Sequence, residues 1–145
     1  MKTTNYAFLL DNVMKKDYRY AYDPKDLWEK ASQKKIIKYN MSDVKHWAYS
    51  PCWSHNDNNN NNNNNDWFIS IYQVLLQPKK FKDHMKRIKN ADTSYPLIIV
   101  EDEYNKFGSI LDGNHRFAKL LMEKKRVVNV VYFTKKELDK IKIEL

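Results

Sequence analysis

The sequence contains very little glycine: Gly108 and Gly113 are the two glycines in 145 residues. A dinucleotide-binding fingerprint needs three glycines in the pattern G-x-G-x-x-G, and a Walker loop needs the pattern G-x-x-x-x-G-K-[ST]. The two glycines have the Walker spacing, but Asn114 and His115 stand where that motif requires Lys and then Ser or Thr. Both glycine-rich nucleotide motifs are therefore excluded.

Cysteine and long apolar segments are scarce as well. Cys52 is the single cysteine, so an internal disulfide and the paired cysteines of a structural zinc site are excluded. The apolar stretch 6–10 is shorter than the core of about 7–15 residues in a secretory signal. No run reaches the roughly 20 apolar residues of a membrane span. We therefore expect an intracellular protein, cytoplasmic or nuclear, with no membrane partner.

Positive charge and aromatic side chains are abundant by contrast. The chain has 26 Lys and Arg residues against 18 Asp and Glu residues, a formal net charge of +8, and 14% of its residues are aromatic. The aromatic side chains supply enough apolar surface for one modest core, and the length fits a single domain over residues 1–145. The charge favours anionic partners such as nucleotides or DNA. A lysine-rich solvated surface explains it equally well.

The spacing of apolar residues predicts an α/β (α+β) domain with a small mixed sheet flanked by helices. The expected helices cover 24–35, 78–90, 113–125 and a segment after Thr134, and the expected strands cover 36–39, 97–100, 107–111 and 127–133. Residues 42–47 are expected as a strand or turn and 49–54 as a loop. The low-complexity asparagine segment at 56–66 is expected to be a surface insertion.

Three residues are expected to cap helices. Asp23 precedes Pro24, which suits the first position of a helix. Asp112 ends a strand just before the third helix, and Thr134 has Glu137 three residues on, the spacing of a capping box.

The segment D-G-N-H-R joins a buried strand to this third helix and is the most informative part of the chain. A helix N-terminus carries unpaired N–H groups and a partial positive charge, so cationic side chains in its first turn are unfavourable unless an anion shares the site. An arginine fork and the helix N–H groups can hold the same phosphate. The predicted phosphate-binding residues are Gly113, Asn114, His115 and Arg116. A structural role stays open, with Asp112 as a cap, His115 as a buried hydrogen-bonding residue and Arg116 as a partner of the acidic residues 101–103.

This segment and its surroundings resemble the ParB/sulfiredoxin-like superfamily, whose members are also known as ParB-like nuclease domains. The resemblance rests on Y-P-L-I-I-V at 95–100, D-G-N-H-R at 112–116 and the Val-rich stretch 127–133, with K-D-H-M at 82–85 and D-T-S-Y-P at 92–96 in support. It covers roughly residues 66–135. It implies a ParB/sulfiredoxin-like fold that binds nucleotide phosphates at the D-G-N-H-R segment, and it adds His84 and Tyr95 as second-tier site residues.

The family contains several activities, which this sequence separates in part. Asn114 stands where sulfiredoxins carry their catalytic Cys, so sulfiredoxin activity is excluded. The resemblance to free-serine kinases with D-G-H-H-R implies a nucleotide-dependent phosphotransferase or NTPase, using ATP or CTP with magnesium. His115 and Asp112 are then the catalytic candidates, and Asp43 and residues 101–103 supply further carboxylates. The alternative is a nucleic-acid-binding module, with or without nuclease activity, that places a backbone phosphate in the same site.

Other candidate residues point less clearly to function. His46, His55 and His84 lack metal-ligand spacing, so no protein-bound metal site is expected. Trp47 and Trp53 flank an aromatic segment that is able to stack on a base, although core packing is the more frequent use of tryptophan. Cys52 is expected to be a neutral thiol without a catalytic role.

Overall fold

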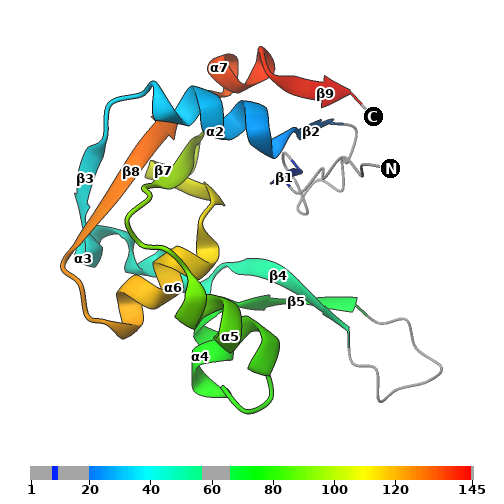
Figure 1. Cartoon of the computed structure of the whole chain (residues 1–145), viewed down its shortest axis with the longest axis vertical. Helices are drawn as coiled ribbons and strands as arrows, with labels where there is room; N and C mark the ends of the chain where they lie inside the picture. Colours follow the sequence, from blue (N-terminus) through cyan, green and yellow to red (C-terminus); the bar gives the residue numbers. More distant parts are fainter. Residues whose placement is uncertain (1–7, 10–19, 57–65, 145) are drawn as a thin grey trace. The chain divides into compact units, whose positions relative to one another are not determined.

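The computed structural model describes residues 8–9, 20–56 and 66–144. Its elements follow one another as shown in Figure 1. In chain order they are β1 (Phe8–Leu9), β2 (Tyr20–Tyr22), α2 (Pro24–Ser32), β3 (Ile37–Asn40), α3 (Met41–Val44), the 3₁₀ helix η1 (Lys45–Tyr49), β4 (Pro51–Asn56), β5 (Asp66–Ser70), α4 (Ile71–Leu76), α5 (Lys82–Asn90), β6 (Leu97–Asp102), β7 (Asn105–Asp112), α6 (Asn114–Met122), β8 (Val127–Phe133), α7 (Lys135–Asp139) and β9 (Lys142–Glu144).

The strands of the described residues form one mixed sheet and two smaller sheets. The four-stranded sheet has the order β3-β8-β6-β7, in which β6 runs parallel to β8 and antiparallel to β7. Strands β4 and β5 form a two-stranded antiparallel sheet, and β1, β2 and β9 form a three-stranded one. The predicted α/β fold with a small mixed sheet flanked by helices is thereby confirmed.

Backbone contacts divide the chain into two compact units. Unit 1 comprises residues 1–37, 96–112 and 129–145, and unit 2 comprises 38–95 and 113–128. The chain passes from unit 1 to unit 2 between Asp112 and Gly113, inside the D-G-N-H-R segment. The expectation of a single domain over 1–145 stays a prediction.

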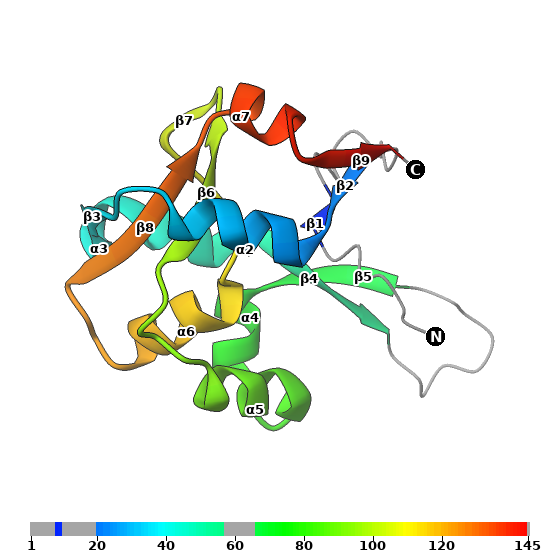
Figure 2. The same ribbon diagram turned by 45° about the horizontal axis from the view of Figure 1, so that its top comes forward.

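The core of unit 1 forms where α2 and α7 pack on β6 and β8 (Figure 2). Its buried side chains are Tyr22, Leu27, Ala31, Ile98, Val131, Phe133 and Leu138. Leu27 and Ala31 stand one turn apart, as the apolar spacing of the sequence predicts. Each fully buried aliphatic side chain of this kind stabilises a fold by about 1.5–3 kcal/mol.

Two expected caps are present in unit 1. The Asp23 side chain accepts a hydrogen bond from the Lys25 N–H at 2.9 Å, with Pro24 in the first turn of α2. Thr134 and Glu137 exchange side-chain and backbone hydrogen bonds in a complete capping box at the start of α7. These short-range predictions are confirmed because a capping motif depends on neighbours only three residues apart.

Gly108 allows β6 and β7 to approach closely. Its φ is +81°, and a Cβ atom at this position would lie 2.5 Å from Ile99 Cγ2 and 2.6 Å from the Val100 carbonyl oxygen. Both the φ of Gly108 and the space around it exclude a side chain, so this position requires glycine.

Unit 2 contains α3, η1, the β4–β5 hairpin and the helices α4, α5 and α6. Its buried apolar side chains include Met41, Val44, Trp47, Ile69, Ile71, Val74, Phe81, Ile88, Phe117 and Ala118. The Trp47 ring packs edge-on against Phe117 of α6, with the ring centroids 5.3 Å apart. Trp47 is thus a core residue, as its more frequent use suggests. Met122, the last residue of α6, is 43% exposed.

The structure corrects the predicted elements around the asparagine run. Residues 42–47 lie in α3 and η1 rather than in a strand, and residues 51–54 belong to β4 rather than to a loop. Helix α4 was not predicted, and the helix expected over 78–90 begins at Lys82. The reason is tertiary: β4 is a strand because β5 pairs with it, through contacts such as Trp53 with Ile69.

The asparagine segment expected at 56–66 connects the two strands of this hairpin. Asn56 and Asp66 are paired at the end of the hairpin. Residues 57–65 lie outside the described residues, so the expectation of a surface insertion stays a prediction.

Helix α6 ends in a Schellman motif with a lysine at its left-handed position. The N–H of Lys124 donates to the Leu121 carbonyl and the N–H of Lys125 to the Leu120 carbonyl, both at 3.0 Å. Lys124 has φ +57°, in a place where glycine is the usual residue. A side chain in this conformation costs about 1 kcal/mol.

Candidate functional site

Helix α6 begins immediately after Gly113, the first residue of the second chain segment of unit 2. Gly113 is its N-cap, with φ +116°, and no side chain caps the helix. The prediction that Asp112 caps this helix is wrong. A left-handed glycine turns the chain into the helix directly, so the Asp112 side chain is not required at the helix end.

Asp112 instead belongs to unit 1, where it contacts helix α2. The indole Nε1–H of Trp28 donates a hydrogen bond of 2.8 Å to Asp112 Oδ2. Trp28 is 54% exposed, and its indole N–H is engaged in this polar contact. The predicted catalytic role of Asp112 stays a prediction.

His115 meets His84 across two helices of unit 2. His84 Nδ1 and His115 Nε2 lie 3.1 Å apart, so one imidazole donates a hydrogen bond to the other. The two rings are inclined by only 21°. His84 was expected from the family resemblance as a second-tier site residue, and the structure brings it into direct contact with His115.

Both imidazole rings stack on one face of Trp53. The ring centroid of Trp53 lies 4.3 Å from that of His84 and 4.4 Å from that of His115, with inclinations of 18° and 20°. The two histidine centroids are 5.4 Å apart. Rings on opposite faces of the indole would be separated by nearly the sum of the two stacking distances, so the pair must lie side by side on the same face.

The environment of His115 keeps its imidazole neutral. Burial, then the neighbouring His84 and the positive charge of Arg87, lower the pKa of His115 from 6.5 to about 4. At neutral pH its ring therefore offers one N–H donor and one lone pair rather than a positive charge. The expected conflict between His115 and the helix dipole does not arise, and Arg116 is the charged residue of the first turn.

Arg116 follows on the first turn of α6, which contains no carboxylate over residues 114–117. The Arg116 side chain is half-buried, with its Nε shielded from solvent. Its positive charge contributes, after hydrogen bonds from Ser94 and the charge of Lys119, to a lowered pKa of the Asp92 carboxyl. Arg116 thus acts electrostatically on a carboxylate within unit 2.

The acidic residues 101–103, proposed as structural partners of Arg116, lie in unit 1, and two of them have local contacts. Glu101 Oε1 accepts from the Lys135 N–H at 2.7 Å, and Asp102 Oδ2 accepts from the Ser109 hydroxyl at 2.6 Å. Hydrogen bonds from Ser109 and from the Tyr104 N–H lower the pKa of Asp102. These contacts give Glu101 and Asp102 structural roles of their own.

A pocket of about 510 Å³ in unit 2 adjoins the histidine pair. His84 lines this pocket together with three cationic residues and one carboxylate. The residues of its wall are Ser54, Lys80, Phe81, Lys82, Asp83, His84 and Arg87. The excess of positive charge makes the pocket suitable for an anion.

The remaining predicted residues divide between the site and the surface. Asn114 is half-buried at the first position of α6. Tyr95 is 64% exposed, which leaves its second-tier site role as a prediction. Burial raises the pKa of the Cys52 thiol to about 12, so the expected neutral thiol is confirmed.

Trp53 and Arg87 are the parts of the site that sequence reasoning missed. Core packing was the preferred role of Trp53, and Arg87 was not among the candidate residues. Arg87 follows His84 by three positions, so the two share a face of α5, and this spacing was the available signal.

Comparison with known proteins gives no relative of this chain. No protein-family model, no curated protein and no solved structure matches it. Among the residues that the structure describes, no helix is long and apolar enough to cross a membrane, and no group of three or more His, Cys, Asp or Glu side chains is arranged to hold a metal ion.

Proposed function

We propose that this protein binds a phosphate-bearing ligand, a nucleotide in the first instance, at the start of α6. The main observation in support of this proposal is the His84–His115 pair, which stacks on Trp53. It lies at the first turn of α6, which contains Arg116 and no carboxylate. The resemblance to ParB/sulfiredoxin-like domains supports the same ligand class.

The physical reason is that three favourable interactions converge on an anion at this end of α6. The first N–H groups of the helix have no partner within the helix, and the helix dipole adds a partial positive charge. Arg116 provides a planar fork of N–H donors that matches a phosphate group. The neutral imidazole of His115 provides one further hydrogen bond without needing a proton from solvent.

The adjoining pocket provides space and charge for the rest of a nucleotide. Lys80, Lys82 and Arg87 would neutralise further phosphate oxygens in its volume of about 510 Å³. Asp83 is the carboxylate of this pocket, and it would share a magnesium ion with the phosphates, since Mg²⁺ is usually held by one or two carboxylates plus substrate oxygens. Such an ion would supply charge neutralisation at the bound phosphates.

For a reaction we propose His115 as the proton acceptor. Its imidazole is unprotonated at neutral pH, and His84 fixes the ring in position through the hydrogen bond between them. This role needs the tautomer in which the Nε2–H of His115 donates to His84, so that the Nδ1 lone pair can accept a proton from a hydroxyl acceptor or from water during phosphoryl transfer or hydrolysis. In this tautomer His115 does not donate a hydrogen bond to the phosphate. ATP and CTP are the first substrates to test.

A nucleic-acid-binding module, with or without nuclease activity, is the second candidate function. The +8 charge favours it, because each backbone phosphate needs a cation. In that case the start of α6 would hold one phosphate of the strand. The salt dependence of binding separates the two functions, since nucleic-acid affinity falls steeply with salt concentration.

Calorimetric titration with ATP, ADP and CTP, with and without magnesium, tests the proposed function. We expect wild-type protein to bind at least one nucleotide. Arg116→Ala should weaken binding by roughly 10–100-fold, the effect of losing a charge-assisted hydrogen bond of about 1.5–3 kcal/mol. Lys38→Ala, which removes an exposed cation of the same unit outside the pocket beside His84, is the matched control and should bind like wild type.

Arg116→Lys provides a second variant that keeps the charge but removes the planar fork, and circular dichroism checks that each variant is folded. Absence of binding to wild type, or equal binding to wild type and to folded Arg116→Ala, would show that the start of α6 is not a phosphate site. Loss of nucleotide binding in Lys38→Ala alone would place the ligand elsewhere in unit 2.

A further inference from the structure

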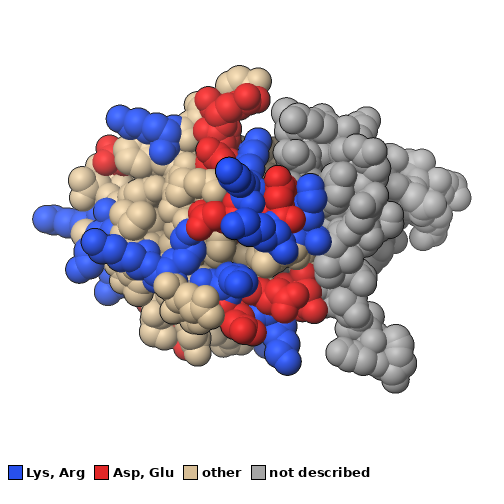
Figure 3. Space-filling view, turned by 90° about the horizontal axis from the view of Figure 1, so that it is seen from above, with Lys and Arg blue, Asp and Glu red and all other residues tan. Residues whose placement is uncertain are grey.

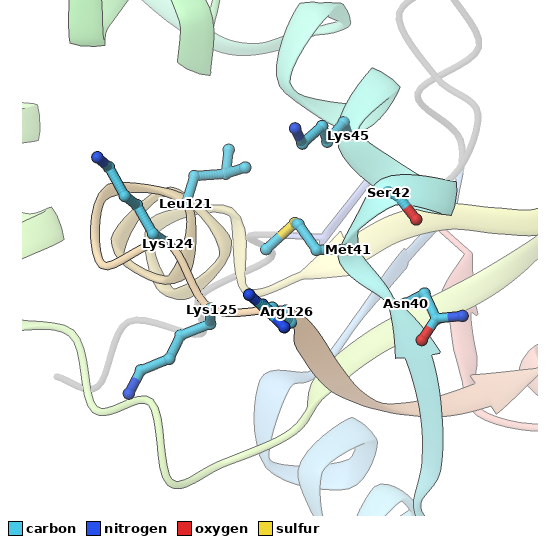
Figure 4. A pocket seen from close by; sticks show the side chains of 8 residues that line it. All are labelled: Asn40, Met41, Ser42, Lys45, Leu121, Lys124, Lys125 and Arg126. Atoms are coloured by element: carbon cyan, nitrogen blue, oxygen red, sulfur yellow. The ribbon is translucent and has the colours of Figure 1, made fainter.

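A second pocket in unit 2, of about 650 Å³, lies at the opposite end of α6 (Figure 4). It is lined by Asn40, Met41, Ser42, Lys45, Leu121, Lys124, Lys125 and Arg126. We propose that this basic pocket binds single-stranded nucleic acid, with backbone phosphates on its cations and a nucleoside against Leu121. The proposal goes beyond the nucleotide site at the start of α6, because it uses none of that site's residues.

The two walls of the basic pocket are fixed to one another. One wall is the segment 40–45, and the other is the segment 121–126. The Met41 N–H donates a 2.8 Å hydrogen bond to the Arg126 carbonyl, which ties the walls together at the base. Met41 and Val44 are buried, so the first wall is anchored in the core of unit 2. A ligand would therefore enter a pocket whose walls are already in place, which lowers the entropy cost of binding.

The charge of the basic pocket has one sign. Four of its eight lining residues are Lys or Arg, and none is acidic. The pocket beside His84 contains Asp83, and a third pocket, in unit 1, contains Glu137. Figure 3, which looks down on the side of α2 and α7, likewise shows Lys and Arg mixed with Asp and Glu. The uncompensated charge thus distinguishes the basic pocket from these other surfaces.

The helix dipole explains only part of this arrangement. Lys124 and Lys125 follow Glu123, the C-cap residue of α6, and lie near the helix C-terminus, where cations are favourable. Lys45 comes from η1 on the opposite wall and gains nothing from that helix end. Lys124 also occupies a left-handed backbone position at a cost of about 1 kcal/mol, where glycine would be relaxed. A cation is therefore present at the pocket in spite of the local backbone preference.

The chemistry of the pocket fits a single strand with unpaired bases. In Figure 4 the Met41 side chain lies at the centre, next to Leu121, and the charged and polar side chains surround it. The half-buried Leu121 gives an apolar surface for the face of a base or a sugar, whereas Met41 is 5% exposed and contributes only an edge of its side chain. The amide of Asn40 and the hydroxyl of Ser42 can hydrogen-bond to the edge of a base. In a duplex the base faces are stacked and unavailable to such a pocket.

The concave form of the basic pocket favours a strand over a membrane surface. An anionic bilayer is flat on the scale of one pocket and would touch only the rim. Phosphates of a strand can enter, and the charges on both walls can then act on them together. Helix α6 has nine residues and is about 14 Å long. A mononucleotide therefore cannot reach from one end of α6 to the other, whereas an oligomer of several nucleotides can.

Fluorescence anisotropy with a labelled 20-nucleotide oligo-dT tests the proposal. The variant is Lys124→Glu with Lys125→Glu. Lys136→Glu with Lys140→Glu in unit 1 is the matched control, because it changes the net charge by the same amount at a different exposed surface. We expect the pocket variant to weaken binding at least tenfold and the control by less than threefold. Because each lost phosphate contact reduces the log–log salt slope by about 0.7 for a single strand, the pocket variant should lower the slope by about 1.4.

Three further measurements distinguish a single strand from a duplex, a membrane surface and a mononucleotide as the ligand of the basic pocket. A 20-base-pair duplex should bind less tightly than the single strand, and phosphatidylserine vesicles should not compete with it. Equal losses in the pocket and control variants, no binding of wild type at 50 mM salt, a preference for duplex, or vesicle binding abolished by the pocket variant would each overturn the proposal. ATP titration of the same variants keeps the two sites apart, because the pocket variant should bind nucleotide at the start of α6 as wild type does.

Discussion

His84 Nδ1 and His115 Nε2 lie 3.1 Å apart over one face of the Trp53 indole. The indole covers one side of the pair, which reduces its access to water. Burial and the charges of His84 and Arg87 disfavour protonation of His115. His115 is thus a neutral side chain in the first turn of α6, and its protonation should be measurable in the stability of the whole chain.

We expect the free energy of unfolding to fall as the pH is lowered from 6.5 to about 4. Burial and the neighbouring His84 and Arg87 lower the pKa of His115 from 6.5 to about 4, so between these values the unfolded chain binds more protons than the folded chain. Stability therefore rises with pH across this window and is fully present above it. The slope for one proton is at most about 1.4 kcal/mol per pH unit, and solvent screening reduces it.

Urea denaturation at several pH values, for wild type and His115→Gln, measures this dependence. His115→Gln should flatten the slope between pH 4 and 6.5, whereas His46→Gln, at an exposed histidine of η1, should keep it. An unchanged slope in His115→Gln would mean that His115 titrates like a solvated histidine.

The Trp28–Asp112 hydrogen bond should appear as a coupling energy within unit 1. Trp28→Phe removes the Nε1–H donor and Asp112→Ala removes the acceptor of the 2.8 Å contact. A double-mutant cycle on the free energy of unfolding should give a coupling of about 0.5–1.5 kcal/mol. Additivity of the two substitutions within about 0.3 kcal/mol would indicate that the contact contributes nothing in solution.

Gly108→Ala should destabilise the protein by about 2–4 kcal/mol. The new Cβ would lie 2.5 Å from Ile99 Cγ2 and 2.6 Å from the Val100 carbonyl oxygen, and the φ of +81° adds strain for any side chain. Chemical denaturation measures the loss. Lys106→Ala, at an exposed position of the same strand, is the control and should change stability by less than 0.5 kcal/mol, roughly the limit for surface substitutions.

Lys119 connects α6 to the end of α5, and its removal should loosen this junction. Its Nζ donates hydrogen bonds of 2.9 Å to the carbonyls of Lys89 and Ala91. Carbonyls at a helix C-terminus have no partner within the helix, so Lys119→Met should cost about 1–2 kcal/mol and raise amide exchange at the end of α5. Lys86→Met, on the exposed surface of α5, is the control. Equal exchange in both variants would contradict this role.

Sequence reasoning succeeds here where the structure depends on near neighbours. The capping box of Thr134 and Glu137, the Asp23 cap and the strand Val127–Phe133 follow from residues a few positions apart, and the structure confirms them. The missed helix α4 also had a local signal, since Ser70 and Gln73 form a capping box. This signal was overlooked next to the asparagine run.

The candidate site was only partly predictable. His115, Arg116 and the glycine between strand and helix were found from local pattern, and His84 from the family resemblance. The contact of His84 with His115, and the stacking of both on Trp53, depend on the packing of α5, α6 and β4, which periodicity does not specify. The error at Asp112 has the same origin: its carboxylate is engaged by Trp28, 84 positions away in sequence.

Lys124 affects both the thermal stability of the protein and the affinity of the basic pocket for an anion, in opposite directions. An effort to engineer a more heat-resistant form of this chain would choose Lys124→Gly early, because glycine relieves a φ of +57°. The same substitution would remove a cation from the wall of the basic pocket. If the pocket binds nucleic acid, optimisation for melting temperature alone would therefore select molecules with weakened binding, and a screen of this protein should score both properties together.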